Sequence, residues 1–196
     1  MQSSNDLSPR AVLARSLLAG ALALGVSAAA MAQKVKLATS AGDMVIELDR
    51  EHAPKSVDNF LQYVKAGHYD GTVFHRVIPG FMIQGGGMSA EMKEKPTRAP
   101  IALESRNGLA NQRGTLAMAR TADPNSATSQ FFVNLKANTF LDASQAPGGD
   151  GYAVFGKVVS GMDTVDKIAA VATGSKGPHQ NVPLQPVIIN KATLEQ

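Results

Sequence analysis

The sequence FHRVIPGFMIQGG, residues 74–86, contains two runs of strand-forming residues on either side of Pro79-Gly80. Pro and Gly together favour a turn, so the segment predicts a β-hairpin. Alternate residues of a strand share a face, and we therefore expect Phe74, Arg76 and Ile78 to point together. An Arg among apolar strand residues is unusual, because burial of its charge is costly without a partner. The pattern alone leaves two interpretations open, an exposed Arg on a polar face and a functional Arg.

Composition limits the classes of protein to which the chain can belong. The chain has 196 residues, 44% of them hydrophobic, which fits one domain with a packed core once any targeting segment is removed. Cys is absent, which excludes disulfides, thiolate nucleophiles and Cys-based zinc sites. The net charge of +3 is mild and shows no clustered basic stripe, so we expect no nucleic-acid partner. The four His residues lack metal-ligand spacing, and we expect no metal and no other cofactor.

Residues 1–32 differ in composition from the rest of the chain. Two Arg residues precede an uncharged apolar run at residues 17–30, and an Ala-Met-Ala sequence ends at Ala32. These parts in this order predict a secretory signal peptide. The alternative is a membrane anchor, but an apolar run of about 14 residues is shorter than the roughly 20 that span a bilayer. We therefore expect cleavage of residues 1–32 and an exported domain at residues 33–196 that makes no membrane contact.

The pattern after the signal segment is one of many short strands and two helices. Residues 34–39 and 43–49 alternate apolar and polar positions, which predicts a second hairpin. Pro54 begins a run with helical spacing, and another such run follows Gly161. Further strands are predicted at residues 72–78, 81–84, 115–119, 130–135, 153–159 and 187–191, and a surface loop at residues 91–113. This pattern favours an antiparallel barrel whose ends are covered by helices.

Four other stretches, like the opening segment, combine apolar side chains with a few polar ones. They are AMARTAD at residues 117–123, SQFFVNL at residues 129–135, FLD at residues 140–142 and YAVFGKV at residues 152–158. Together with the opening segment they supply apolar Phe, Met and Leu side chains and a few polar donors, Arg76, Gln84 and Gln130. That is the composition of an apolar pocket with a few aimed donors.

These motifs resemble the cyclophilins, the peptidyl-prolyl cis-trans isomerases, over nearly the whole chain after residue 32. The signal segment, AMARTAD and Tyr152 are most similar to the bacterial periplasmic branch. The resemblance implies a mainly β fold, a closed eight-stranded antiparallel β-barrel capped by two α-helices. It also implies a surface groove that binds extended, proline-containing polypeptides in the periplasm. We expect a monomer, because the sequence shows no apolar surface stripe.

The family's functional positions match residues of this chain one at a time. Arg76 matches the catalytic Arg, and Gln84 matches the Gln that binds a substrate carbonyl and supports the Arg. The resemblance implies a proline pocket formed by Phe81, Met82, Phe132 and Leu141, and a peptide groove to which Ala119, Arg120, Gln130, Phe140 and Tyr152 contribute.

Three of these positions depart from the best-known eukaryotic pattern. Phe140 stands where a Trp is common, and that Trp donates a hydrogen bond to the inhibitor cyclosporin, which Phe cannot do. Tyr152 replaces a common His, and Arg120 replaces a frequent Asn whose backbone is the part mainly used. We therefore expect weak cyclosporin binding with activity retained.

The expected function is acceleration of X-Pro isomerisation during the folding of exported proteins, with Arg76 as a donor to the prolyl nitrogen. No bond breaks in this reaction, so neither a nucleophile nor a metal is needed. Two alternatives are a holdase that grips proline-containing segments with little catalysis and a small-ligand carrier barrel. A hydrolase built on Ser126, Ser129 and His75 is disfavoured because the G-x-S-x-G elbow is absent.

Overall fold

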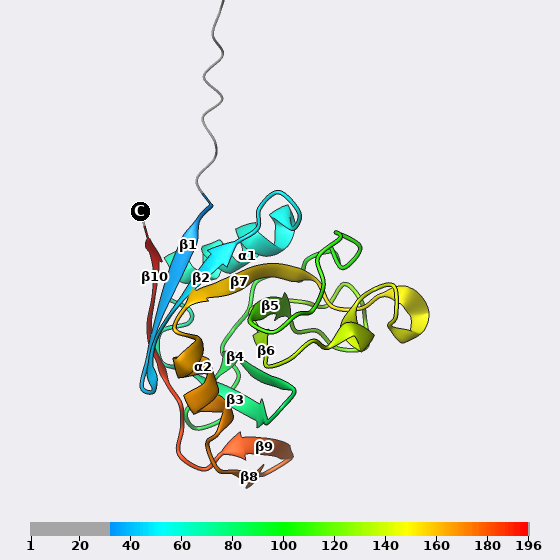
Figure 1. Cartoon of the computed structure of the whole chain (residues 1–196). Helices are drawn as coiled ribbons and strands as arrows, with labels where there is room; N and C mark the ends of the chain where they lie inside the picture. Colours follow the sequence, from blue (N-terminus) through cyan, green and yellow to red (C-terminus); the bar gives the residue numbers. More distant parts are fainter. Residues whose placement is uncertain (1–31, 196) are drawn as a thin grey trace, which may run out of the picture. The chain divides into compact units, whose positions relative to one another are not determined.

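The structure is a computed structural model that describes residues 32–195. The predicted signal peptide, residues 1–32, lies outside the described residues apart from Ala32. The described residues form one strongly curled β-sheet with two α-helices packed against it (Figure 1). Between residues 32 and 195 no helix is long and apolar enough to cross a membrane.

Eight strands make up the sheet, and each pairs antiparallel with its neighbours in the order β10-β1-β2-β7-β5-β6-β4-β3. The strands are β1 (Lys34–Thr39), β2 (Gly42–Leu48), β3 (Thr72–Ile78), β4 (Met82–Ser89), β5 (Thr115–Met118), β6 (Phe131–Asn134), β7 (Val154–Ser160) and β10 (Ile189–Glu195). Both predicted hairpins, β1–β2 and β3–β4, are confirmed. The other strands match their predicted bounds to within one residue, except that β4 continues to Ser89 beyond the predicted residue 84 and β10 covers Ile189–Glu195 where residues 187–191 were expected.

The two edge strands, β3 and β10, come together where the sheet curls on itself. A single bridge pairs Val73 with Ile188, the N–H of Gly71 donates to the carbonyl of Ile189 (2.8 Å), and the N–H of Phe74 donates to that of Val187 (2.9 Å). No continuous ladder joins the two edges within residues 32–195. The expected eight-stranded fold is therefore right, but the barrel is closed over only these few residues.

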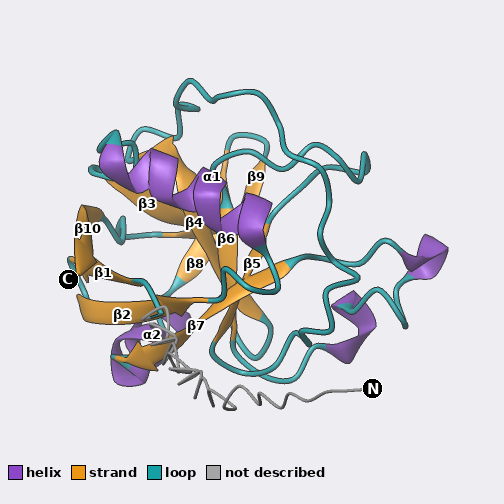
Figure 2. Ribbon diagram, turned by 90° about the horizontal axis from the view of Figure 1, so that it is seen from above, coloured by secondary structure: helices purple, strands orange, loops and turns teal. Residues whose placement is uncertain are grey.

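The helices α1 (Pro54–Lys65) and α2 (Met162–Ala169) cover the core, as the sequence predicts (Figure 2). Phe60 of α1 is fully buried, and its ring centroid lies 5.1 Å from that of Tyr69, 5.6 Å from that of Phe131 and 5.3 Å from that of Phe155. Aromatic pairs at such distances add to the stabilisation that comes from area burial. This cluster fixes α1 against the inner face of the sheet.

The register of the β3–β4 hairpin contradicts one prediction about its faces. Phe74 pairs with Gly85 and Arg76 pairs with Gln84, so β3 advances two residues while β4 advances one. The extra residue, His75, makes a β-bulge, and a bulge re-aims the side chains that follow it. Phe74 is consequently buried in the core, whereas Arg76 is exposed on the outer face. Strict alternation would make Phe74 and Arg76 point to the same face, and the structure shows that they do not.

The first turn of α1 is capped from a distant part of the chain. The residue before the helix is Ala53, which offers no capping side chain. The carboxylate of Glu104 accepts hydrogen bonds from the backbone N–H of Lys55 (3.0 Å) and Ser56 (2.8 Å), and from the Ser56 hydroxyl (2.7 Å). N–H groups in the first turn have no partner within the helix, so this carboxylate satisfies two of them. The predicted loop at residues 91–113 is thus tied to the helix.

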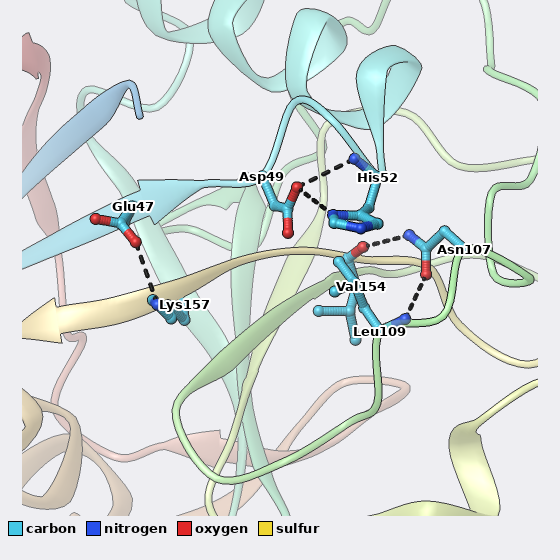
Figure 3. Close-up of polar contacts among 7 residues, drawn as sticks. All are labelled: Glu47, Asp49, His52, Asn107, Leu109, Val154 and Lys157. Carbon is cyan, nitrogen blue, oxygen red and sulfur yellow. Dashed lines mark hydrogen bonds and ion pairs between the residues drawn. The ribbon is translucent and has the colours of Figure 1, made fainter. Parts of the chain in front are cut away.

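Polar contacts in two loops secure the chain near β7 (Figure 3). Asn107 donates from its amide to the carbonyl of Val154 (2.9 Å) and accepts from the N–H of Leu109 (3.1 Å). Asp49 accepts from the backbone N–H of His52 (3.1 Å) and hydrogen bonds to the ring Nδ1 (2.8 Å), and this bond raises the pKa of His52. The first contact holds the long loop beside the strand that carries Val154.

The structure contains a second, smaller sheet that the sequence analysis does not predict. The strands β8 (Thr173–Lys176) and β9 (His179–Pro183) form a hairpin that lies beside β3 (Figure 1). The tip is a tight turn at Gly177-Pro178, in which Gly177 has φ 58°, and Asn181 within β9 also has a positive φ, 59°. Gly, Ser, Lys, His and Gln dominate this segment, so it lacks the apolar alternation that marks a strand in sequence.

Candidate active site

A pocket of about 180 Å³ opens on the outer face of the sheet. Its walls are the side chains of Arg76, Phe81, Met82, Gln84, Ala119, Arg120, Phe132, Leu141 and Tyr152. These residues come from β3, the turn between β3 and β4, β4, β6, the loop after β5, the 3₁₀-helix η1 (Thr139–Leu141) and the chain before β7. Nine of the eleven predicted site residues therefore converge on one cavity.

Strand alternation explains why the pocket is apolar on the outside of the barrel. On β6, Phe131 and Val133 face the core, while Phe132 belongs to a separate outer cluster. On β4, Ile83 faces the core and Met82 faces outward in the same way. Since both faces of these strands are apolar, the outer side chains form the floor of the pocket instead of a solvated surface.

Arg76, Gln84 and Gln130 form a chain of hydrogen bonds at the rim of the pocket. Nη1 of Arg76 donates to Oε1 of Gln84 (3.4 Å), and Nε2 of Gln84 donates to Oε1 of Gln130 (2.9 Å). Gly87 makes room for this chain, because a Cβ at that position would collide with Cγ of Gln130. The single long bond to Gln84 orients Arg76 and leaves most of its N–H groups available for a ligand.

Arg120 and Tyr152 both line the pocket and contact each other. The guanidinium of Arg120 donates from Nε (3.0 Å) and Nη2 (2.8 Å) to the carbonyl of Gly151 and lies over the ring of Tyr152. The Tyr152 ring meets Phe132 edge-on, with centroids 5.6 Å apart. Two of the three departures from the eukaryotic pattern thus contact each other. The Arg120 side chain lines the pocket, although the sequence indicated a role mainly for its backbone.

Two predicted residues lie outside the walls of this pocket. Phe140 is 52% exposed and stacks on Phe81, with ring centroids 5.7 Å apart and planes at 27°. Gln130 lines a neighbouring cavity, which it shares with Arg76 and Gln84. Phe140 therefore sits at the rim, and Gln130 reaches the pocket only through Gln84.

Buried asparagines that the sequence analysis did not identify hold the pocket in shape. Asn134 donates to Oδ1 of Asn111 (3.1 Å) and accepts from Asn138 (2.8 Å), and all three are fully buried. Asn138 also donates to the carbonyl of Phe81 (2.9 Å), and Asn111 donates to Asp142 (2.9 Å). The network thereby connects Phe81 to the residues around Leu141. Asparagines carry no sequence periodicity that could have revealed this connection.

His75 precedes Arg76, the candidate catalytic residue, but its side chain is buried. It is only 6% exposed, and burial lowers its pKa to about 4, so the ring is neutral near pH 7.

In the part of the chain that the structure describes, the serines of the hydrolase alternative have no His partner. Ser126 uses its hydroxyl to donate to the carbonyl of Asp123 (2.7 Å), and among the described residues no His hydrogen bonds to Ser126 or Ser129. Residues 32–195 also contain no group of three or more His, Asp or Glu residues that could hold a metal ion. The arrangement offers a cationic donor beside an apolar pocket.

Comparisons with known proteins show the family to which the chain belongs. The family model described as cyclophilin type peptidyl-prolyl cis-trans isomerase/CLD matches residues 34–194. The chain is 60% identical over 165 residues to a peptidyl-prolyl cis-trans isomerase of Acinetobacter baylyi, covering 84% of this chain and 87% of that one. It is 54% identical over 167 residues to peptidyl-prolyl cis-trans isomerase A of Dickeya dadantii, covering 85% and 87%.

A solved structure shows the same fold. It is a cyclophilin type peptidyl-prolyl cis-trans isomerase of Cryptosporidium parvum, determined in the presence of the dipeptide Ala-Pro, with a TM-score of 0.69 and 29% identity. The match covers 84% of this chain and 99% of that one. The chain belongs to the cyclophilin-type peptidyl-prolyl cis-trans isomerases and is an enzyme of that class.

Proposed function

We propose that the enzyme catalyses X-Pro isomerisation by donation from Arg76 to the prolyl nitrogen, and that its substrates are exported polypeptides during folding. The observation that carries the mechanism is that Arg76 lines the same 180 Å³ pocket as Phe81, Met82, Phe132 and Leu141. A proline ring held by these apolar side chains would place its nitrogen near the guanidinium.

The physical demand of the reaction is rotation about a bond with partial double-bond character. The nitrogen shares its lone pair with the carbonyl, and the barrier is about 18–20 kcal/mol. In the twisted transition state the lone pair returns to nitrogen, which then accepts a hydrogen bond much better than it does in the planar state. A donor aimed at that nitrogen therefore binds the transition state more tightly than the substrate.

Arg76 meets this demand because its charge is permanent and its donors are held in a rigid plane. The hydrogen bond to Gln84 limits how the plane can turn, which reduces reorganisation during the reaction. Loss of a preorganised donor of this kind typically costs about 2.7–4 kcal/mol, or roughly 10²–10³ in rate. The apolar pocket would contribute the rest by holding the ring still while the preceding carbonyl turns.

The test is NMR exchange spectroscopy on a short Ala-Pro peptide, which measures the cis–trans rate directly. We expect Arg76→Ala to lower kcat/KM by at least ~100-fold. Arg76→Lys keeps the charge but not the planar fork, so it should recover only part of the rate. Matched circular dichroism spectra and unfolding midpoints would show that both variants fold.

The outcome also separates catalysis from holding. If Arg76→Ala isomerises at close to the wild-type rate, the assigned role of Arg76 is wrong. If the wild-type protein binds the peptide without accelerating exchange, the protein acts as a holdase for proline-containing segments.

Export is proposed from the composition of residues 1–32 alone. A positive region, an apolar region and an A-x-A pattern support cleavage after Ala32 and a periplasmic location in a bacterial cell. Cell fractionation with N-terminal sequencing of the recovered protein tests this. An unprocessed N-terminus in the cytoplasmic fraction would contradict it.

A further inference from the structure

A second cavity adjoins the proline pocket, and Arg76 and Gln84 line both. Its volume is about 470 Å³, larger than that of the pocket itself. The opposite wall is the tip of the β8–β9 hairpin, residues 178–181. We call this space the flanking cavity. Because a peptide strand advances about 3.3 Å per residue, a chain with its proline in the pocket places nearby residues in this adjoining space.

The lining of the flanking cavity is polar and contains no carboxylate. Besides Arg76 and Gln84 it includes His75, Gln130, His179 and Gln180, and neither Asp nor Glu is among its lining residues. Arg76 forms no ion pair with any residue of the described chain, where Gln84 is its only side-chain partner. The positive charge of Arg76 is therefore uncompensated on this side of the site.

Hydrogen bonds occupy the amide oxygens of both Gln84 and Gln130. Oε1 of Gln130 is occupied, because it accepts from Nε2 of Gln84, whose own Oε1 accepts from Arg76. The Gln130 side chain packs against Gly87, and it also hydrogen bonds to the buried ring of His75. The chain from Arg76 to Gln130 thus leaves the N–H groups of Arg76 as the donors available to a ligand.

We propose that the flanking cavity binds the carboxylate side chain of an Asp or Glu residue close to the proline in the substrate. A carboxylate is an acceptor only and carries the charge opposite to that of Arg76, so it matches both the hydrogen bonding and the field of the cavity. A Lys side chain in the same place would bring a like charge and donors without acceptors. This inference rests on the proposed function, since it assigns a preference to the same site.

The test is a set of Ala-rich hexapeptides with one central proline, in which Glu, Gln or Lys replaces one Ala at a time on either side. Cis–trans exchange rates give kcat/KM for each peptide at low salt. At one position we expect Glu to exceed Lys by about three- to fivefold, as for a partly exposed ion pair, with Gln between them. This difference should shrink in 0.5 M NaCl, because salt screens exposed charges.

Matched charge variants locate the preference in the cavity. Gln180→Glu places a negative charge on the exposed hairpin tip and should abolish or invert the preference for Glu. Gln62→Glu adds the same charge on the exposed face of α1, away from the cavity, and should leave the preference unchanged. His179→Glu repeats the test at a second cavity position.

The results distinguish this inference from the proposed function. Equal rates for Glu and Lys peptides at every position, with acceleration intact, would overturn the carboxylate preference alone. A preference that survives both Gln180→Glu and His179→Glu would also overturn its placement in the cavity. Absence of acceleration with every peptide would instead contradict the proposed function.

Discussion

The guanidinium of Arg120 lies over the ring of Tyr152, with its central carbon 4.6 Å from the ring centroid. The same guanidinium donates twice to the carbonyl of Gly151, so the cation is fixed to the backbone just before the ring it covers. A cation at this distance from an aromatic face contributes about 0.5–1 kcal/mol at an exposed site. Arg120 therefore holds in place one wall of the 180 Å³ pocket.

Removal of this contact should weaken substrate binding more than it slows the chemical step. We expect Arg120→Ala to raise KM for an Ala-Pro peptide by about two- to fivefold while kcat changes little. Tyr152→Phe keeps the ring and serves as the control, with a KM close to that of the wild type. A fall in kcat with unchanged KM in Arg120→Ala would show that Arg120 does not act by positioning the pocket wall.

The buried asparagine network should be essential to both stability and activity. Asn134→Leu removes the donor to Asn111 and one of the two acceptors of Asn138. Oδ1 of Asn111 is then buried without a donor, and Asn138 keeps only its bond to the carbonyl of Phe81. We expect the free energy of unfolding to fall by about 1–3 kcal/mol, the cost of an unsatisfied buried group. Urea denaturation measures the loss. Peptide affinity at low urea should fall as well, because Asn138 holds the carbonyl of Phe81.

The distant cap of α1 should affect stability without affecting catalysis. Glu104→Ala leaves the first-turn N–H groups of Lys55 and Ser56 without their acceptor. Loss of a capping side chain costs about 0.5–2 kcal/mol, and we expect that decrease in urea denaturation with kcat/KM unchanged. Glu51→Ala, an exposed Glu in the turn before the helix, is the matched control and should change neither quantity. A loss of activity at full stability in Glu104→Ala would contradict a purely structural role.

Burial of His75 should make the folded protein less stable in acid. Burial lowers its pKa from 6.5 to about 4, so between these pH values the unfolded chain binds a proton that the folded chain does not. Its contribution to the free energy of unfolding is therefore complete above pH 6.5 and falls as the pH drops toward 4, by an amount of the order of 3 kcal/mol. Unfolding curves between pH 7.5 and 4 measure the effect. His75→Gln should lose less stability over that interval than the wild type, and parallel losses would show that His75 does not ionise in this way.

We expect weak cyclosporin binding because residue 140 is Phe. It stands where the family resemblance places a hydrogen-bond-donating Trp, and its ring is half exposed and stacked on Phe81. Phe140→Trp restores a donor at the rim, and one net hydrogen bond of about 0.5–1.5 kcal/mol should tighten the affinity by roughly two- to tenfold. Titration calorimetry of both proteins checks this, with peptide isomerisation retained in each. Nanomolar affinity in the wild-type chain would contradict the prediction.

Local pattern determined the β1–β2 hairpin, the positions of α1 and α2, and the presence of Arg76 and Gln84 on neighbouring strands. Strand alternation and helical spacing repeat over a few residues, so they can be read from sequence. The pocket residues Phe81, Phe132 and Leu141 were found through specific family motifs, since their order in the chain does not reveal that they share one cavity.

Tertiary structure alone decided which way the FHRVIPGFMIQGG side chains point. One extra residue in β3, His75, separates Phe74 in the core from Arg76 on the surface, and the size of that offset depends on pairing with Gly85 and Gln84. The cap from Glu104, the asparagine network and the β8–β9 hairpin beside Arg76 likewise join segments tens of residues apart. Sequence specified the donor and the apolar side chains of the site, while register and long-range packing placed them around one space, because such contacts depend on how distant segments meet and leave no local period in the chain.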